Sequence, residues 1–163
     1  MLENYKLHIE AIPDFPVPGI LYRDIQPLLE NPHVFKNAVI DMRGLTNELP
    51  AFWAGIESRG FLFASALSIC FGGGVRLIRK KGKLPNPQLQ TIDYGLEYGK
   101  DALEIDVDRS KGSVIIVDDV VATSGTFKAA EDLCARAGLE VIDRIALIDI
   151  GIVEHNVKCL IKY

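Results

Sequence analysis

The sequence predicts an α/β fold in which helices flank a mainly parallel central sheet. Val114-Ile115-Ile116-Val117 is an unbroken run of β-branched aliphatic residues, typical of a strand that is buried on both faces. Twice, over 51–70 and 114–137, an apolar run is followed by a small polar loop and then by apolar residues at helical spacing. Strands that alternate with helices indicate a parallel sheet, for which we expect roughly five parallel strands.

The start of the chain is expected to lie outside this alternation. Apolar residues at helical spacing predict a short amphipathic helix over 2–11. The segment 12–25 holds three prolines, which exclude a helix and favour an extended conformation. It is either a plain strap across the sheet or a surface for a flat heterocycle, because Phe15, Leu21 and Arg23 combine an aromatic ring, an apolar side chain and a fixed cation. On the residues alone, the strap is the simpler interpretation.

The first strand–loop–helix unit follows a helix that is predicted to begin at Pro32, with Asn31 as its N-cap. The unit consists of a strand over 51–56, a loop over 57–60 and a helix that runs through Cys70. Loops after parallel strands meet at the carboxyl edge of the sheet, where ligands bind. Arg59 in this loop is therefore a candidate anion ligand; the alternative is a surface arginine paired with Glu57.

A basic cluster follows the strand predicted over 74–79. Its five members fall within eight residues of an otherwise acidic chain: Arg76, Arg79, Lys80, Lys81 and Lys83. The cluster is either an anion site or a solvated loop. Residues 82–94 hold two prolines and few apolar anchors, so they form either a disordered connection or a mobile lid. Gly138 is suited to end the helix after the central strand, and 141–150 and 157–161 supply further strands.

The segment 114–126 points most directly to chemistry. Asp118 and Asp119 end the buried run and precede the small, hydroxyl-rich loop Ala122-Thr123-Ser124-Gly125-Thr126 and a helix. Such a loop presents N–H groups and hydroxyls to a phosphate, and adjacent carboxylates can accept hydrogen bonds from ribose hydroxyls. The segment lacks the lysine of a Walker P-loop and the glycine spacing of a dinucleotide-binding motif. The alternative is that the aspartates merely end a strand and Thr123 or Ser124 caps a helix.

Composition and charge narrow the class of protein. With 163 residues, of which 48% are hydrophobic, the chain is most simply one domain over 1–163. A formal charge of -4 argues against a general nucleic-acid binder, and the absence of a signal peptide and of a long apolar run predicts a cytoplasmic protein with no membrane partner. Cys70 and Cys134 are expected to be buried free thiols. Metal-ligand spacing is missing among the cysteines and histidines, so no zinc site is expected.

Together, the motifs resemble those of the adenine phosphoribosyltransferases, a family of type I phosphoribosyltransferases. The segment 15–25 resembles their base-binding hood, 54–61 their pyrophosphate loop, 78–85 and 96–99 the two ends of their catalytic lid, and 114–126 their motif for 5-phosphoribosyl-1-pyrophosphate (PRPP). The resemblance implies the type I phosphoribosyltransferase fold, with a hood over 1–30 and a lid over 80–100. It also implies a homodimer that converts adenine and PRPP to AMP and pyrophosphate with Mg2+.

The resemblance further implies a role for each matching residue. Ala122, Thr123, Ser124, Gly125 and Thr126 would hold the 5′-phosphate, and Asp118 and Asp119 would hold the ribose hydroxyls and offset charge as the sugar becomes oxocarbenium-like. Arg59, Arg79, Lys80 and Lys83 would bind pyrophosphate, with magnesium coordinated by PRPP oxygens and water rather than by the protein. Adenine would lie between Leu21 and Arg23 on one side and Ile150 on the other, and Glu97 would handle its imidazole proton.

The chain departs from the family at Ser124, where glycine is more common, in a lid that is one residue longer, and after Ile150.

The alternative functions are a PRPP or nucleotide sensor that binds nucleic acid, and a transferase for hypoxanthine or guanine. A sensor would want a broad basic face, which a chain of charge -4 lacks. The other transferases prefer a different loop at Ser58-Arg59 and lack the proline-rich hood. Phe61 and Phe63 are expected to be exposed in the dimer contact near the pyrophosphate loop.

Overall fold

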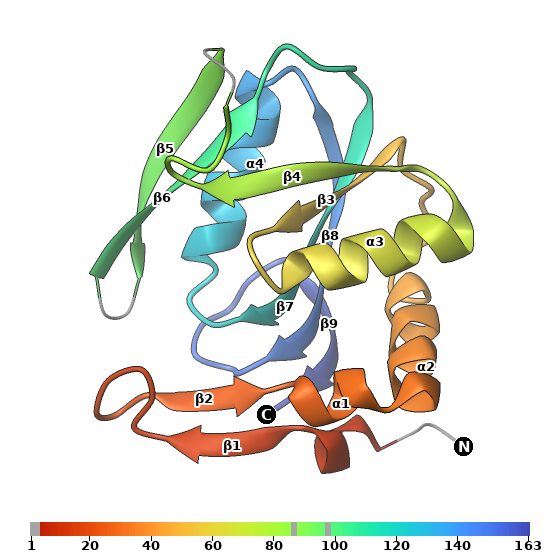
Figure 1. Ribbon diagram of the computed structural model, residues 1–163, viewed down its shortest axis with the longest axis vertical. Helices are drawn as coiled ribbons and strands as arrows, with labels where there is room; N and C mark the ends of the chain where they lie inside the picture. Colours follow the sequence, from red (N-terminus) through yellow and green to blue (C-terminus); the bar gives the residue numbers. More distant parts are fainter. Residues whose placement is uncertain (1–3, 86–87, 97–98) are drawn as a thin grey trace.

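A computed structural model describes residues 4–85, 88–96 and 99–163. Its central sheet has the strand order β5-β6-β4-β3-β7-β8-β9 (Figure 1). The strands are β3 (Phe52–Ile56), β4 (Gly74–Lys80), β5 (Leu89–Leu96), β6 (Gly99–Asp106), β7 (Ser113–Val121), β8 (Glu140–Asp149) and β9 (Lys158–Lys162). Among the described residues, β4, β3, β7, β8 and β9 run parallel, which confirms the expected parallel sheet.

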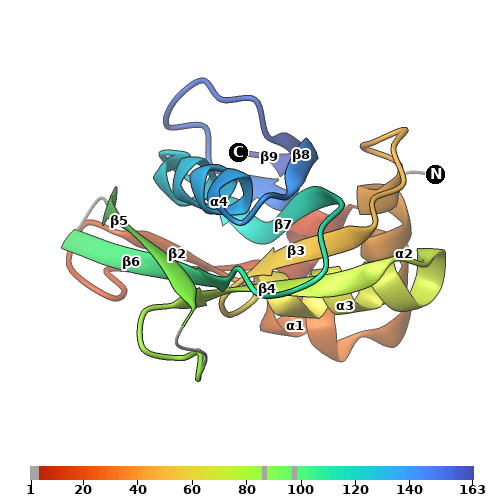
Figure 2. The same cartoon turned by 90° about the horizontal axis from the view of Figure 1, so that it is seen from above.

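Helices cover both faces of this sheet. Figure 2 shows α4 (Gly125–Arg136) on one face, with α2 (Pro32–Arg43) and α3 (Gly60–Phe71) on the other. The run Val114–Val117 supplies both cores. Ile115 and Val117 belong to the cluster that holds Phe63 of α3, whereas Val114 and Ile116 belong to the cluster that holds Phe127 of α4. Because successive side chains of a strand alternate between faces, a strand covered on both sides is apolar throughout.

Two sequence expectations about strands are corrected. The acidic pair does not end the central strand: β7 continues to Val121, because its backbone pairs with β8 as far as Val121 opposite Asp149. The segment 82–94 is not a disordered connection at 89–94. It contains most of β5, which pairs antiparallel with β6, and β6 pairs antiparallel with β4. Backbone pairing across the sheet, which local composition does not report, decides both outcomes.

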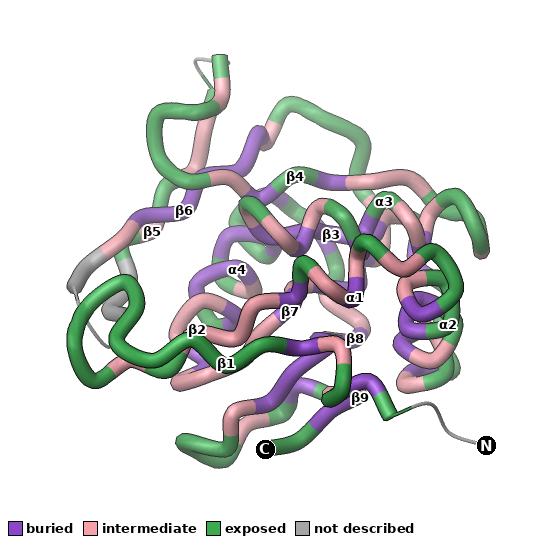
Figure 3. The backbone as a smooth tube through the Cα atoms, turned by 60° about the horizontal axis from the view of Figure 1, so that its bottom comes forward, coloured by how far each residue is buried: buried purple, intermediate pink, exposed green. Residues whose placement is uncertain are grey.

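The N-terminal segment forms a second, two-stranded sheet. Of the helix expected over 2–11, the described part contains a 3-10 turn at Tyr5–His8 and is wrong at 10–11, which belong to a strand; residues 2 and 3 lie outside the described residues. β1 (Glu10–Pro13) and β2 (Leu21–Asp24) pair antiparallel with Glu10 opposite Asp24, and we call this pair the N-terminal hairpin. Figure 3 shows that β1 is exposed along its length. The short α1 (Gln26–Glu30) then leads into α2.

The helix ends agree with expectation. The Asn31 side chain accepts hydrogen bonds from the N–H groups of His33 and Val34 (3.1 and 3.2 Å), as an N-cap does. Gly138 adopts a positive φ of 71° after α4, where a residue without a side chain ends a helix most readily.

Of three expectations about burial along the helices, two are wrong and one is confirmed. Phe63 is fully buried rather than exposed, because it packs edge to face on Phe35. Cys70 is exposed rather than buried, because the inner stripe of α3 continues through Phe71. The prediction that Cys134 is buried is confirmed. Among the described residues, no helix has the length and apolarity needed to cross a membrane.

Candidate functional site

A cavity of about 260 Å³ lies where the carboxyl ends of the parallel strands meet the N-terminal hairpin. Its wall gathers most of the site residues predicted from the sequence: Leu21, Arg23, Arg59, Lys80, Asp118, Asp119, Ala122, Thr123, Ser124, Thr126 and Ile150. Gly125, Arg79 and Lys83 are not part of the wall, and Glu97 lies outside the described residues. Residues from distant parts of the chain therefore share one concave site, as expected at the edge of a parallel sheet.

The acidic pair sits in the floor of this cavity. Asp119 is buried, and its Oδ2 lies 2.8 Å from Nε of Arg59. Burial raises the pKa of Asp118 well above the ordinary value of an aspartate, and the adjacent charge of Asp119 raises it further. Burial also raises the pKa of Asp119, against the opposing effect of Arg59. The pair thus resists carrying two full negative charges until another positive charge enters the cavity.

Arg59 connects the acidic pair to the N-terminal hairpin. Its Nη1 donates hydrogen bonds to the Tyr22 hydroxyl (2.8 Å) and to the Arg23 carbonyl oxygen (3.1 Å), and its guanidinium lies 4.9 Å from the centre of the Tyr22 ring. The alternative that Arg59 pairs with Glu57 is wrong, since Asp119 is its carboxylate partner. Tyr22 is a site residue that the sequence did not single out, because only the folded hairpin brings it to Arg59.

Gly60 makes the approach of the two loops possible. A Cβ atom at this position would lie 2.6 Å from the Val117 carbonyl oxygen and 3.0 Å from Oδ1 of Asp118. Both distances are shorter than ordinary contacts, so a side chain would push the start of α3 away from β7. The glycine therefore sets the separation between Arg59 and the acidic pair.

The loop Ala122–Thr126 meets the start of α4 at the cavity. The first N–H that donates back into the helix is that of Lys128, to the Ser124 carbonyl oxygen (3.0 Å). The N–H groups of the first turn before it have no partner within the helix, which suits an anion. Ser124 adopts the left-handed conformation (φ 61°), which glycine adopts more readily. Its buried hydroxyl makes no hydrogen bond to any part of the chain that the structure describes. A hydroxyl is therefore available at the anion site.

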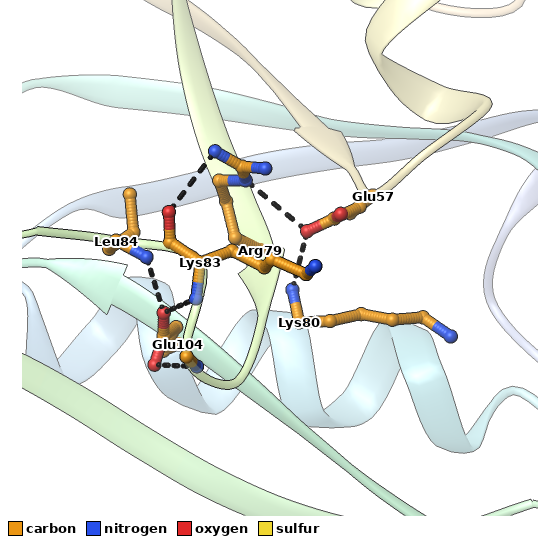
Figure 4. A network of polar contacts seen from close by, with 7 residues as sticks. Glu57, Arg79, Lys80, Lys83, Leu84 and Glu104 are labelled. Atoms are coloured by element: carbon orange, nitrogen blue, oxygen red, sulfur yellow. Dashed lines mark hydrogen bonds and ion pairs between the residues drawn. The ribbon is translucent and has the colours of Figure 1, made fainter.

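Two cations, Arg79 and Lys80, lie at the end of β4. Figure 4 shows Glu57, on the loop after β3, accepting a hydrogen bond from the Lys80 N–H (2.8 Å) while its Oε2 pairs with Nε of Arg79 (3.2 Å). Burial opposes ionisation of Glu57, but these two groups lower its pKa below the ordinary value. Lys80 itself pairs with Asp101 of β6 (2.9 Å). Arg76, the first member of the basic cluster, is buried elsewhere and donates to the Asp106 carbonyl oxygen.

Glu104 of β6 fixes the turn after β4. Its carboxylate accepts hydrogen bonds from three successive N–H groups, those of Gly82, Lys83 and Leu84, at 2.8 to 3.0 Å (Figure 4). The side chain is almost fully buried, at 2% exposure. Glu104 is a second site residue that the sequence did not single out. A carboxylate that alternates with apolar residues is expected to face solvent, and only the pairing of β6 with β4 places this one against the turn.

The opposite side of the cavity is apolar and partly open. Leu21 is 48% exposed and Phe15 is 51% exposed, with the Phe15 ring packed edge-on against Tyr22. Ile150, which follows β8, is also part of the cavity wall. The Arg23 guanidinium lies 3.7 Å from the centre of the Tyr163 ring. A flat ligand could thus lie between Leu21 and Ile150, beside a cation whose orientation is set by stacking.

Comparison with known proteins identifies relatives of this chain. Residues 39–157 match the family model described as phosphoribosyl transferase domain. The adenine phosphoribosyltransferase of Carboxydothermus hydrogenoformans is 43% identical over 164 residues, covering 95% of this chain and 92% of that protein. The mouse adenine phosphoribosyltransferase is also 43% identical, over 87% of this chain and 82% of its own length.

Solved structures of adenine phosphoribosyltransferases are also similar to this chain. The adenine phosphoribosyltransferase of Thermoanaerobacter pseudethanolicus superposes with a TM-score of 0.92 at 35% identity, covering all of both chains. The Saccharomyces cerevisiae adenine phosphoribosyltransferase, solved with adenine and an imino-altritol bisphosphate, superposes with a TM-score of 0.83 at 30% identity, covering 96% of both chains.

We expect Glu104→Gln to loosen the turn after β4. The amide keeps one acceptor oxygen but presents N–H groups where a backbone N–H must be accepted, so unfolding should require about 1 to 3 kcal/mol less. Urea denaturation measures this loss, and amide hydrogen exchange at Gly82 to Leu84 should accelerate. Exposed Glu140→Gln is the matched control. Equal stability of the two variants would contradict the assigned role.

We expect Asp118→Asn to stabilise the fold at neutral pH. A raised carboxyl pKa means that the folded state binds the proton more tightly than the unfolded chain does. Its contribution to stability is therefore greatest below the unfolded pKa and is lost as the pH rises through the folded pKa. The variant should gain several degrees in Tm, because each kcal/mol of stability moves the Tm of a domain of this size by about 2 to 4 °C.

Calorimetry at pH 5 and pH 8, with exposed Asp108→Asn as control, tests this expectation. The gain for Asp118→Asn should be larger at pH 8. A gain that is absent, or that is independent of pH, would show that the carboxylate of Asp118 ionises freely in the folded protein.

Proposed function

The chain belongs to the adenine phosphoribosyltransferase family, and from that membership we propose how its residues convert adenine and PRPP to AMP and pyrophosphate in purine salvage. In this reaction N9 of adenine forms a bond to C1′ of the ribose, the bond from C1′ to the pyrophosphate oxygen breaks, and the base loses its imidazole proton. The observation that carries the proposal is the acidic pair placed directly before the loop Ala122–Thr126 in one cavity with Arg59.

The loop holds the 5′-phosphate. The N–H groups of the first turn of α4 and the hydroxyls of Thr123, Ser124 and Thr126 are the donors, and the dipoles of the helix favour the negative charge. The unpaired, buried hydroxyl of Ser124 supports its use as a donor.

The acidic pair binds the ribose hydroxyls and stabilises the transition state. As the pyrophosphate departs, positive charge develops on the sugar, and carboxylates fixed in a buried site attract that charge more strongly than they would in water. The raised pKa values of Asp118 and Asp119 fit this use, because the entering positive charge favours their ionised forms. Ionisation of the pair is thereby coupled to the presence of the reacting sugar.

Arg59, Arg79, Lys80 and Lys83 bind the pyrophosphate. Three of them carry carboxylate partners in the described structure: Arg59 with Asp119, Arg79 with Glu57 and Lys80 with Asp101. These pairs hold the cations in position before the substrate arrives. The phosphate oxygens then bind the cations beside the carboxylates or in their place. Prepositioned donors of this kind need little rearrangement when charge develops on the leaving group.

Magnesium is the expected cofactor, and the donor set fits an ion that enters with PRPP. Mg2+ prefers oxygen ligands and keeps several waters. Because Glu57, Asp101 and Asp119 already pair with cations, PRPP oxygens and water would be the direct ligands of the ion. When bound, the ion neutralises charge on the departing pyrophosphate.

The N-terminal region over 1–30 serves as the base hood, and 80–100 serves as the lid. Adenine lies between Leu21 and Ile150, next to Arg23, and the open apolar wall formed by Leu21 supports this placement. Glu97 handles the imidazole proton; this role rests on the resemblance of the segment 96–99 to the family. The lid excludes water, which would otherwise compete with N9 for C1′.

The protein acts as a homodimer in the cytoplasm. Leu62 and Ile69 are 45% and 86% exposed and lie seven residues apart on α3, hence on the same face of the helix that follows the pyrophosphate loop. These side chains replace Phe63, which is buried, in the expected contact, whereas the half-buried Phe61 remains part of it. Three cysteines without disulfide bonds fit a reducing compartment.

We expect AMP from adenine and PRPP with magnesium, and no nucleotide from hypoxanthine or guanine. Quantifying each nucleotide by chromatography tests activity and base choice together. The double variant Asp118→Asn/Asp119→Asn should lose at least about 100-fold in rate, since both charges that oppose the developing cation are gone. The exposed Asp108→Asn should remain active. No product from any base, despite saturable PRPP binding, would favour the sensor instead.

We expect the protein to sediment at twice 18.0 kDa at micromolar concentration. Ile69→Glu places a charge in the proposed contact and should yield a species of 18.0 kDa by analytical ultracentrifugation. Leu7→Glu, on the 3-10 turn and 79% exposed in the parent, is the matched control and should leave the dimer intact. Sedimentation of the parent as a monomer would overturn the dimer.

A further inference from the structure

The Arg59 guanidinium is held from three directions. Its Nε lies 2.8 Å from Oδ2 of Asp119, near the end of β7. Its Nη1 donates one hydrogen bond to the Tyr22 hydroxyl (2.8 Å) and one to the Arg23 carbonyl oxygen (3.1 Å) of the N-terminal hairpin. A guanidinium carries five N–H groups in one plane, one on Nε and two on each terminal nitrogen. Both N–H groups of Nη1 are therefore used inside the protein, and Nε is paired with a carboxylate.

The remaining nitrogen, Nη2, is available to a ligand. Within residues 4–85, 88–96 and 99–163 it makes no hydrogen bond. Arg59 lines the cavity, and 29% of its side chain is exposed. The two N–H groups of Nη2 can thus bind oxygens of an anion while the contacts of Nε and Nη1 stay in place. The contacts to the N-terminal hairpin then decide where these two N–H groups point.

Tyr22 supplies the hairpin contact that comes from a side chain, whereas the Arg23 carbonyl belongs to the backbone. Tyr22 lies in β2 opposite Ile12 of β1, and its ring packs edge to face on Phe15 with the ring centres 5.1 Å apart. The hairpin therefore fixes the ring, and the guanidinium of Arg59 lies 4.9 Å from its centre. A phenylalanine at this position would keep the ring contacts and lose only the hydroxyl that accepts the shorter hydrogen bond.

We propose that Tyr22 is a positioning residue for the pyrophosphate site, and that its hydroxyl orients the Nη2 donors of Arg59 toward the ligand. This role rests on the proposed function, because pyrophosphate is the anion assigned to Arg59 there. A donor that is already oriented loses less freedom when it binds, so loss of that orientation weakens binding without removing any contact to the ligand. The N-terminal hairpin thus serves both substrates, since Leu21 and Arg23 lie at the base and Tyr22 acts on the leaving group.

Two other roles of Tyr22 make different predictions. A ring that serves the hood alone would affect adenine, so its loss would change the KM for adenine. The Tyr22 hydroxyl also carries a proton, which it donates to no group in the part of the chain that the structure describes. A hydroxyl that binds a phosphate oxygen directly would have an effect that persists without the Arg59 guanidinium.

Isothermal titration calorimetry with magnesium pyrophosphate measures binding without turnover. We expect Tyr22→Phe to weaken pyrophosphate binding about fivefold, a usual coupling between residues of one hydrogen-bond network. In steady-state assays the KM for PRPP should rise by a similar factor, while the KM for adenine stays the same. Ser113→Ala is the matched control, because it also removes a hydroxyl that accepts an N–H, that of Ala51, at the opposite end of β7. It should leave pyrophosphate binding unchanged.

Arg59→Lys tests whether Tyr22 acts through the guanidinium. Lysine keeps a positive charge beside Asp119 but lacks the planar set of donors. In this background Tyr22→Phe should have no further effect on pyrophosphate binding, and far-ultraviolet circular dichroism verifies that each variant is folded. An equal loss in both backgrounds, a loss confined to the KM for adenine, or no loss at all would overturn the role of Tyr22.

The two assays also separate this role from the proposed reaction. AMP formation by the parent, with pyrophosphate binding unchanged in Tyr22→Phe, would overturn the role of Tyr22 and leave the proposed function intact. A loss of pyrophosphate binding that depends on Arg59, without AMP formation by the parent, would support the role of Tyr22 and contradict the proposed reaction.

Discussion

The ion pair between Arg59 and Asp119 is the contact on which the cavity depends. Its 2.8 Å distance joins the loop after β3 to the end of β7, and the same guanidinium holds the hydroxyl of Tyr22 in the N-terminal hairpin. Three segments that are distant in sequence therefore meet at one charged group. Because Asp119 is buried, removing Arg59 would leave a desolvated charge without its partner, which costs far more than the loss of an exposed pair. The close approach in turn requires a residue without a side chain at Gly60.

The other charges of the site follow the same pattern of cations held by carboxylates. Glu57 orients Arg79, and Asp101 orients Lys80, so two strands and a loop fix the cations before a ligand is present. Glu104 acts one step further away, since it binds the backbone of the turn and no cation. The acidic pair combines this pattern with a second feature: Asp119 holds Arg59, and it lies beside Asp118, so that two carboxylates of raised pKa are adjacent. That local cost to stability is typical of residues arranged for a ligand rather than for the fold.

The features that depend on short-range interactions were predicted from the sequence. The buried run Val114–Val117, the cap at Asn31 and the glycine after α4 are all where short-range patterns indicate them. Pairing between distant segments explains what was missed: β8 extends β7 beyond the aspartates, and β6 turns the segment after β4 into part of a hairpin. The roles of Asp101 and Glu104 follow from the pairing of β6, and the role of Tyr22 follows from the pairing of β1 with β2. Most residues of α3 are apolar, so the sequence alone does not show that Phe63 lies on its buried side and Cys70 on its exposed side.

The last residues of the chain help to fix the side of the cavity at which Arg23 lies. The Tyr163 N–H donates to the Asp149 carbonyl oxygen (3.0 Å), and the Tyr163 ring stacks under the Arg23 guanidinium. Gly151 allows this arrangement, because a Cβ there would lie 2.9 Å from the Tyr163 carbonyl oxygen. The orientation of Arg23 in the hairpin thus depends on β9, and the position of β9 depends on how the connection after Asp149 folds. The wall of the cavity around Arg23 is therefore held by backbone contacts at the end of the chain as well as by the N-terminal hairpin.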